Sequence, residues 1–209
     1  MATSLLSTTT AKVLASVVLV GGAASVAGLG TFGSFTSSTS ASANVTSGVV
    51  QLGLNQGAVA TTVAATQVLP GDTIQRAVTL TRSAGTESFG SVKMTTSTST
   101  PNLLTSDATN GLQLAIDSCS VAWTKGASDN SLSCSGTTTS VLASRAVIGT
   151  NLDLAAATTA LNANAGSAGA VNLRLSMVLP TAADNTFQGL TNAVTFTFDA
   201  TQKATATYR

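Results

Sequence analysis

The chain has 209 residues, of which 44% are hydrophobic and only 8% are charged, and its formal net charge is +1. Because it has no basic run interleaved with aromatic residues, the composition argues against a nucleic-acid-binding surface. Histidine is absent, which removes the commonest general base and the commonest zinc ligand. With so few ions, the surface must be polar through Ser, Thr, Asn and Gln, as in a secreted protein.

An apolar segment opens the chain. Lys12 is followed by an apolar run from Val13 to about Val26, and no charged residue appears again before Asp72. This run fits the hydrophobic region of a secretory signal peptide, and its Gly and Ala content makes it a poor permanent membrane span. We therefore expect residues 1–33 to be removed. A retained segment would anchor the domain to the outer face of the membrane, which is the one membrane contact expected.

The cleavage site and the segment that follows it leave alternatives open. Gly33 and Ser34 offer small residues for a signal peptidase, and Ala41-Ser42-Ala43 is a second small-residue triplet farther from the apolar run. Residues 34–46 are uncharged and low in complexity, which by composition favours a disordered mature N-terminus. The alternative is a segment of high β propensity that becomes ordered when it pairs with another subunit.

From residue 47 onward, short strand patterns alternate with turn signals. Strands are expected around residues 50–54, 73–82, 88–96, 111–117, 171–179 and 194–201, with a return strand through Leu132 and Cys134. Residues 60–69 are expected to form a strand or an extended loop. The tripeptide Pro70-Gly71-Asp72 is a strong turn signal.

Two strand predictions carry further detail. In Thr73–Arg82, Arg76 shares a face with Ile74, Val78 and Leu80, so it must reach an edge or a partner. The last two strands each place an apolar set on one face: Val171, Leu173, Leu175, Met177 and Leu179 in the first, and Val194, Phe196, Phe198 and Ala200 in the second.

Helix is expected in only two places. Residues 101–109 read as a connecting loop that holds one helical turn, and the Ala-rich stretch 140–161 is expected to form a short helix. Many short strands and little helix predict an all-β fold for residues 47–209, an antiparallel two-sheet jelly-roll sandwich with one or two short helices in loops.

Cys119 and Cys134 are the chain's two cysteines and are predicted to form a disulfide, because the chain carries an export signal. A zinc half-site would need two further ligands that histidine cannot supply, and the C-x-x-C spacing of a redox pair is absent. Trp123 lies between the two cysteines. Its indole either covers the disulfide or, if exposed, offers a platform for a ligand.

No constellation of residues predicts catalysis. The carboxylates are scattered singly, as turn and capping residues are, although Asp184 and Asn185 could join a calcium site. Without histidine and without G-x-S-x-G, a nucleophilic serine would need a lysine partner, and no lysine has a fixed spacing to a serine. We therefore expect no catalytic residue, no metal and no cofactor.

Five stretches together resemble the TasA/camelysin family of secreted bacterial proteins, in the right order and over most of the chain. They are VLVGGAASVAGLGTFGSF, VTSGVVQLGL, LPGDTIQRAVTLTRSAG, GLQLAIDSCSVAW and VNLRLSMVLPTAADNTFQGLTNAVTFTFDATQ. Residues 140–170 match least and look like a longer or altered insertion. The resemblance favours cleavage near Gly33 and Ser34, with a mature start close to Phe35.

The resemblance implies a jelly-roll subunit of extracellular biofilm-matrix filaments, in which the N-terminal segment of one subunit completes a sheet of its neighbour. Carried over to this chain, the donor strand comprises Phe35, Thr36, Ser37, Ser38, Thr39, Ser40, Ala41, Ser42, Ala43, Asn44 and Val45. The main partner is then the protein itself, joined head to tail, with accessory assembly or anchoring proteins as further partners.

Two other functions remain as alternatives at this point. One is a monomeric secreted surface adhesin or binding module. The other is a secreted peptidase, since some members of the family are labelled metalloproteases; this chain has no H-E-x-x-H motif, so we expect it not to be an enzyme. In each case we expect the protein in the extracellular matrix or at the cell surface.

Overall fold

The computed structural model describes residues 42–44, 49–53, 59–126, 131–164 and 167–203. For residues 42–52 within these ranges and for Val59, it describes the backbone alone. The predicted signal segment, residues 1–33, and its cleavage residues Gly33 and Ser34 lie outside the described residues.

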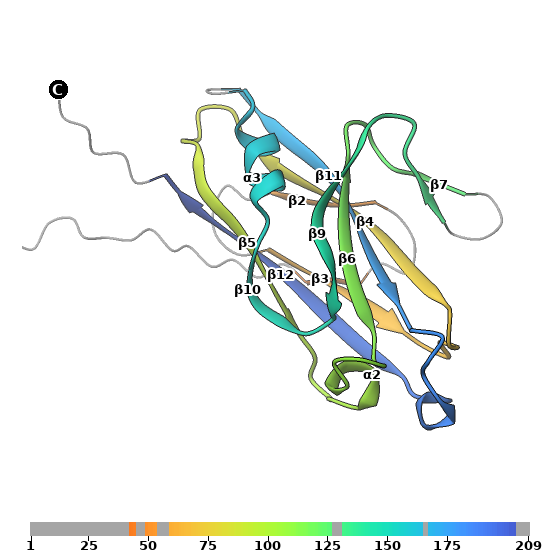
Figure 1. The fold of residues 1–209 in the computed structure, drawn as a ribbon. Helices are drawn as coiled ribbons and strands as arrows, with labels where there is room; N and C mark the ends of the chain where they lie inside the picture. Colours follow the sequence, from red (N-terminus) through yellow and green to blue (C-terminus); the bar gives the residue numbers. More distant parts are fainter. Residues whose placement is uncertain (1–41, 45–48, 54–58, 127–130, 165–166, 204–209) are drawn as a thin grey trace, which may run out of the picture. The chain divides into compact units, whose positions relative to one another are not determined.

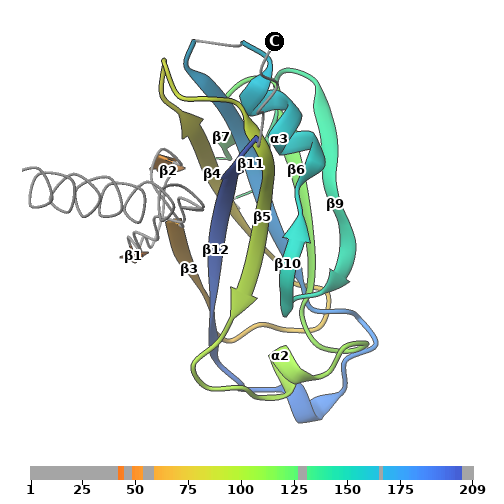
Figure 2. The same ribbon diagram turned by 90° about the vertical axis from the view of Figure 1, so that its left-hand side faces the viewer.

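Two five-stranded sheets make up most of the described chain (Figures 1 and 2). Sheet A has the order β1 (Ser42–Asn44), β3 (Val59–Ala65), β12 (Asn192–Gln202), β5 (Phe89–Ser97) and β10 (Gly149–Asp153). Sheet B has the order β2 (Val49–Gly53), β4 (Thr73–Arg82), β11 (Gly169–Val178), β6 (Gln113–Cys119) and β9 (Thr138–Ala146). A separate short hairpin pairs β7 (Thr124–Lys125) with β8 (Leu132–Ser133).

The order of the long strands is that of a jelly roll, so the predicted fold class is confirmed. From β3 to β6 and again from β9 to β12, successive long strands alternate between the two sheets, and their neighbours within each sheet are antiparallel. β6 and β9 are the exception because they lie side by side in sheet B. Because of this alternation the chain wraps around one core, and almost every pair of neighbouring strands joins residues that are far apart in the sequence.

The core lies between the two sheets and is built from the alternating residues that the last two strands present. In β11, Val171, Leu173, Leu175 and Met177 are buried while the residues between them are partly exposed. In β12, Val194, Phe196 and Phe198 are completely buried. Both predicted faces are confirmed, and each buried aliphatic or aromatic side chain contributes roughly 1.5–3 kcal/mol to stability.

Helices are short and lie in connections. They are α2 (Leu103–Ser106), α3 (Ala155–Asn162) and the 3₁₀ turn η1 (Asn185–Phe187). The helical turn expected within residues 101–109 is therefore confirmed as α2, whose start is capped by Asn102 through its side chain and the backbone N–H of Leu104.

The prediction of a helix over residues 140–161 is wrong for its first two thirds. Residues up to Ala146 belong to β9, residues 149–153 form β10, and helix begins only at Ala155. β9 pairs with β6, and β10 pairs with β5, so each supplies the partner that an otherwise open sheet edge needs. These pairings override the weak helix preference of the alanines, and the segment is an integral part of both sheets.

The predicted return strand also has a different partner. Leu132 and Ser133 form β8, which pairs with β7 in a small hairpin, whereas the strand that returns along β6 is β9. Among the described residues, no helix is both long and apolar enough to cross a membrane.

Candidate functional site

Among the described residues, β1 and β2 lie nearest the N-terminus, and they form the only parallel pairings in that part of the chain. β1 pairs with β3 so that Ser42 lies opposite Ala60 and Asn44 opposite Thr62. β2 pairs with β4 so that Val49 lies opposite Ala77 and Gly53 opposite Thr81. One short stretch of chain, residues 42–53, therefore adds an outer strand to each of the two sheets.

Without this stretch, β3 and β4 would be the edge strands of two four-stranded antiparallel sheets. An edge strand presents a row of backbone N–H and C=O groups that need partners, and it readily pairs with another extended chain. β1 and β2 occupy these edges by main-chain hydrogen bonding, which places few demands on the side chains of the added strand. We call the outer edges of β3 and β4 the acceptor edges.

Ser42, Ala43 and Asn44 are the members of the predicted donor strand that the structure describes, and they form β1. The other predicted donor residues, Phe35 to Ala41 and Val45, lie outside the described residues. β2 was not part of the predicted donor, so sequence reasoning found one of the two added strands and treated the other as part of the sandwich.

At the opposite edge of sheet A, the short outer strand β10 covers one part of β5, and the chain's own helix covers the part beyond it. The backbone N–H of Leu154 donates to the carbonyl of Val92 at 2.9 Å, and the hydroxyl of Thr158 accepts from the N–H of Val92 at 2.9 Å. One turn farther along α3, the Asn162 side chain accepts from the N–H of Phe89 at 2.9 Å and donates to its carbonyl at 2.8 Å. The side chains of α3 thus take the place of a neighbouring strand along β5.

The outer strand on the opposite side of sheet B, β9, is protected in another way. Its pairing with β6 shifts register twice, between Leu114 and Ile116 and between Ile116 and Asp117. Such irregularities twist an edge away from a flat, regular pairing surface. Of the four outer edges, only those of β3 and β4 are long, regular and completed by the N-terminal stretch.

A buried arginine holds the closing helix in place, and the sequence analysis did not single it out. Arg82 is only 1% exposed. Its guanidinium donates to four backbone carbonyls, those of Thr86, Leu161, Asn164 and Ser167, at 2.6 to 3.0 Å. These bonds tie the C-terminal end of α3 to β4 and satisfy most of the donors of the buried cation. Arg82 follows Val78 and Leu80 at alternate positions of the strand, and this spacing could have indicated that its side chain faces the core.

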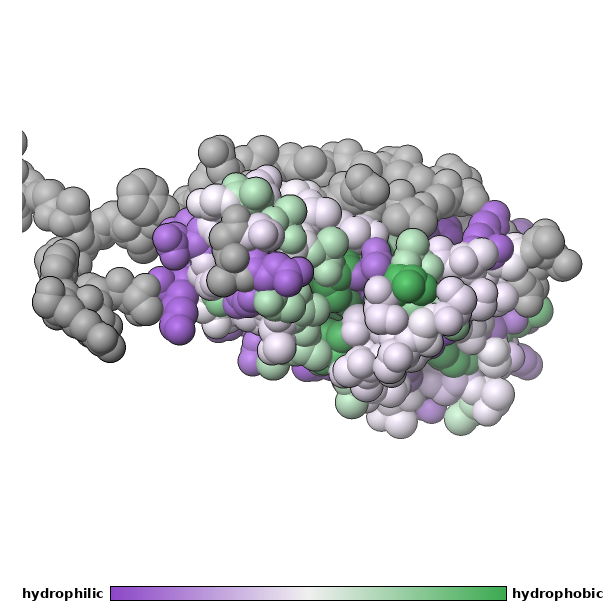
Figure 3. Space-filling view, turned by 90° about the horizontal axis from the view of Figure 1, so that it is seen from above, coloured by the Kyte–Doolittle hydropathy of each residue, from purple (hydrophilic) through white to green (hydrophobic). Residues whose placement is uncertain are grey.

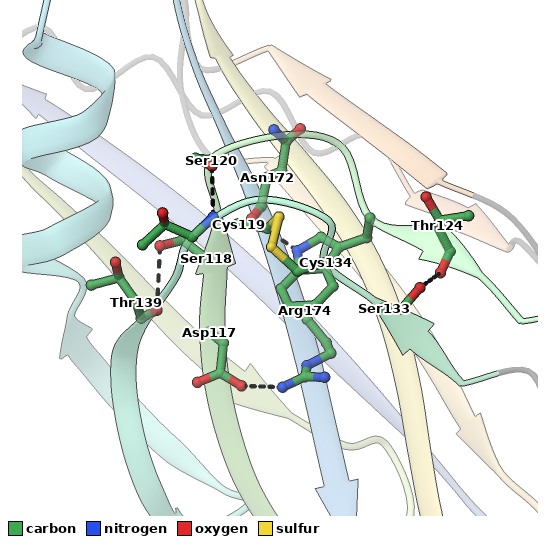
Figure 4. The surroundings of a disulfide bond; sticks show 12 residues. Asp117, Ser118, Cys119, Ser120, Thr124, Ser133, Cys134, Thr139, Asn172 and Arg174 are labelled. Carbon is green, nitrogen blue, oxygen red and sulfur yellow. Dashed lines mark hydrogen bonds and ion pairs between the residues drawn. A yellow bond between two sulfur atoms is a disulfide. The ribbon is translucent and has the colours of Figure 1, made fainter.

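The disulfide lies on the outer face of sheet B, outside the main core (Figure 4). Cys119 at the end of β6 is bonded to Cys134, which directly follows β8, with 5.9 Å between their Cα atoms. The predicted pairing is present in the structure. It fastens the β7–β8 hairpin to the sheet.

Trp123 is 5% exposed and packs against the disulfide together with Ala77. Its indole N–H donates to the carbonyl of Asn172 at 3.0 Å, and the guanidinium carbon of Arg174 lies 4.5 Å from the ring centroid. Arg174 also forms an ion pair with Asp117 at 2.7 Å, which Figure 4 shows. The indole therefore covers the disulfide, and the ligand platform is not formed.

Two acidic residues, Asp184 and Asp107, organise loops. Asp184 accepts from the N–H of Thr186 at 2.9 Å and from its hydroxyl, and these bonds lower the pKa of the Asp184 carboxyl. Asp107 accepts from the backbone N–H groups of Asn110 and Thr109, which lowers the pKa of its carboxyl as well. Within the described ranges, no three His, Cys, Asp or Glu residues gather closely enough to hold a metal ion.

Replacing both cysteines with serine (Cys119→Ser with Cys134→Ser) should destabilise the protein by about 3 kcal/mol, because the bond closes a loop of 15 residues. The single tryptophan, Trp123, packs on the bond, so its fluorescence reports directly on unfolding in denaturant. A neighbouring Ser133→Ala variant with the bond intact serves as the control. An unfolding midpoint that does not change on removal of the bond would contradict this role.

Comparison with known proteins gives one match. The family model described as camelysin metallo-endopeptidase matches residues 8–207, nearly the whole chain. No curated protein matches, and no solved structure matches. The matched range includes the N-terminal stretch, both acceptor strands and the disulfide loop. The chain therefore belongs to the camelysin family, in agreement with the resemblance seen in its sequence.

Proposed function

We propose that this protein is a structural subunit of extracellular filaments, in the biofilm matrix or at the cell surface, that polymerises by N-terminal donor-strand exchange. The observation that carries the proposal is the pairing of residues 42–44 and 49–53 with the outer edges of the two sheets. In the polymer, the same stretch of one subunit occupies the acceptor edges of the next.

The exchange costs little in bonding because the donated strand makes the same main-chain hydrogen bonds in either position. This is the physics of domain swapping, in which an identical element is exchanged between copies. Donor and acceptor are different surfaces, so each subunit can give its strand to one neighbour and accept a strand from another. Contacts of this head-to-tail kind generate open filaments when the rotation between subunits does not close a ring.

The donor region has the composition that strand addition requires. Between Lys12 and Asp72 it contains no charged residue, so no ion has to be desolvated when the strand enters an acceptor edge. Removal of residues 1–33 after Gly33 would leave Phe35 near the new N-terminus and free the segment to reach a neighbour. Accessory proteins that start or anchor the filament fit this model as further partners.

The outer surface is also suited to close packing of subunits. In the face seen in Figure 3, side chains of intermediate hydropathy predominate among the described residues, with groups of strongly hydrophilic and of hydrophobic side chains between them. On sheet A, hydroxyl groups pair across strands, as Thr62 with Thr195 at 3.0 Å and Ser91 with Thr201 at 2.8 Å. A surface that is polar through hydroxyl groups can approach another subunit without burying unpaired charges.

The two alternatives have less support. A monomeric adhesin would be favoured by an exposed indole platform, and Trp123 is buried against the disulfide. A peptidase is suggested by the name of the matching family. The chain has no histidine for a zinc site or a general base, and its two cysteines are bonded to each other. We therefore propose that the protein is not an enzyme and needs no cofactor.

Strand exchange can be detected by mixing, before assembly, two variants that each carry one added cysteine beside the native Cys119–Cys134 disulfide. Asn44→Cys places a thiol in β1, and Thr62→Cys places one in the opposite position of β3. If the donor comes from a neighbouring subunit, oxidation should link the two different chains into dimers on a non-reducing gel. A Thr95→Cys chain, half-buried like Thr62 but in the inner strand β5, is the matched control and should not be linked.

The double variant with both substitutions in one chain completes the design. A bond that forms only within this double variant, and never between mixed chains, would show that the segment stays on its own subunit. That result would contradict strand exchange.

The absence of peptidase activity is expected as well. Purified protein incubated with an unfolded protein substrate should give no cleavage that a metal chelator abolishes, because the chain lacks the residues that zinc peptidases use. Chelator-sensitive cleavage that co-purifies with the protein would contradict the structural role as its sole function.

A further inference from the structure

The β7–β8 hairpin that the disulfide fastens forms a small apolar cluster on the outer face of sheet B (Figure 4). Ala77, Cys119 and Trp123 are its buried members, and Leu132 and Cys134 are partly buried against them. We call these five residues the hairpin cluster. The cluster is separate from the main core, and its partly exposed members leave apolar surface for a further side chain.

The hairpin cluster reaches the acceptor edge of sheet B. Ala77 belongs to β4 itself, and Leu132 is held above this strand because its N–H donates to the Gln75 side chain at 2.7 Å. The carbonyl of Leu132 accepts from the Arg174 guanidinium at 3.2 Å, so the neighbouring strand β11 holds the same residue. The cluster therefore lies directly beside the edge to which β2 is added.

The register of β2 brings one of its residues to this cluster. Val49 stands opposite Ala77, and Gln51 stands opposite Thr79. Paired residues of neighbouring strands lie on the same face of a sheet. Ala77 belongs to the hairpin cluster on the outer face, so position 49 is an outer-face position beside that cluster.

The sequence of β2 agrees with this placement. Val50 and Leu52 are apolar, as expected for residues paired with the core positions of β4. At the alternate positions, Gln51 and Gly53 offer no apolar side chain, whereas Val49 does. Val49 therefore breaks the alternation of its own strand at the one position that the register sets beside an apolar cluster.

We propose that the hairpin cluster is the docking site for Val49 of a second copy of this chain, when that copy donates its strand to the acceptor edge of β4. This inference rests on the proposed function. The contact would fix the register, because a shift by two residues keeps the same side chains on each face and β4 begins at Thr73, ahead of Ala77. The disulfide contributes by holding the hairpin, and with it Leu132, on the sheet.

The test compares the concentration needed for assembly, measured by light scattering of the purified protein, among variants of β2. Val49→Thr keeps the branched shape but replaces a methyl group with a hydroxyl, and it should raise the required concentration roughly 5- to 20-fold. Val49→Ile keeps an apolar branched side chain and should assemble as the unmodified chain does. Gln51→Thr makes its change at the next outer-face position, opposite Thr79, and should also assemble normally.

Leu132→Ala alters the other side of the proposed contact. It should raise the required concentration by a similar factor. The double variant with Val49→Thr should need no more than the worse single variant, because both changes remove the same contact. Unfolding followed by Trp123 fluorescence checks that Leu132→Ala folds, and if it does not, the comparison of Val49→Thr with Val49→Ile decides alone.

Assembly of Val49→Thr at the unmodified concentration would overturn the inference and leave the proposed function intact. Equal losses in Val49→Thr and Val49→Ile, or factors that multiply in the double variant, would overturn it as well. If the unmodified chain forms no filaments at any concentration, the proposed function fails and this inference fails with it.

Discussion

The main-chain hydrogen bonding of two outer strands, β3 and β4, is the constraint on which the rest of this structure depends. Four antiparallel strands in each sheet enclose the core, and their outer members on one side are completed only by the short parallel strands of residues 42–53. Backbone groups at a sheet edge need partners. A chain that completes both edges with one terminal stretch can receive the same stretch from another copy.

The rest of the molecule is closed by its own residues, and it does this with few charges. Arg82 binds backbone carbonyls, while Thr158 and Asn162 of α3 act as a substitute strand along β5. At the far end, Asn192 donates to the carbonyl of Thr100 at 3.0 Å and to the Asn102 side chain at 3.0 Å. The sole ion pair among the described residues is Arg174 with Asp117 on the outer face of sheet B. Backbone and amide groups thus form most of these hydrogen bonds. The acceptor edges differ because their hydrogen-bond partners come from the N-terminal stretch.

Sequence patterns were sufficient for the elements that alternate strictly, such as β11 and β12, because a period of two follows directly from burial on one face. They failed over residues 140–153, where alanine content suggested helix but the sheet edges required strands. They also missed Arg82, and they predicted β2 as a strand without indicating that it adds to the edge of sheet B. Both depend on contacts between residues far apart in the chain, and no local pattern reports which edge a segment will cover. The disulfide could be predicted because the chain has only two cysteines.

The measurement that tests the central claim most directly is negative-stain microscopy of the purified chain beginning near Phe35, beside a chain beginning near Thr46. The shorter chain lacks β1 and the residues before it but keeps both acceptor strands. Our account predicts filaments from the longer chain and monomers from the shorter one at the same high concentration. Filaments from both chains, or monomers from both, would contradict assembly through this segment.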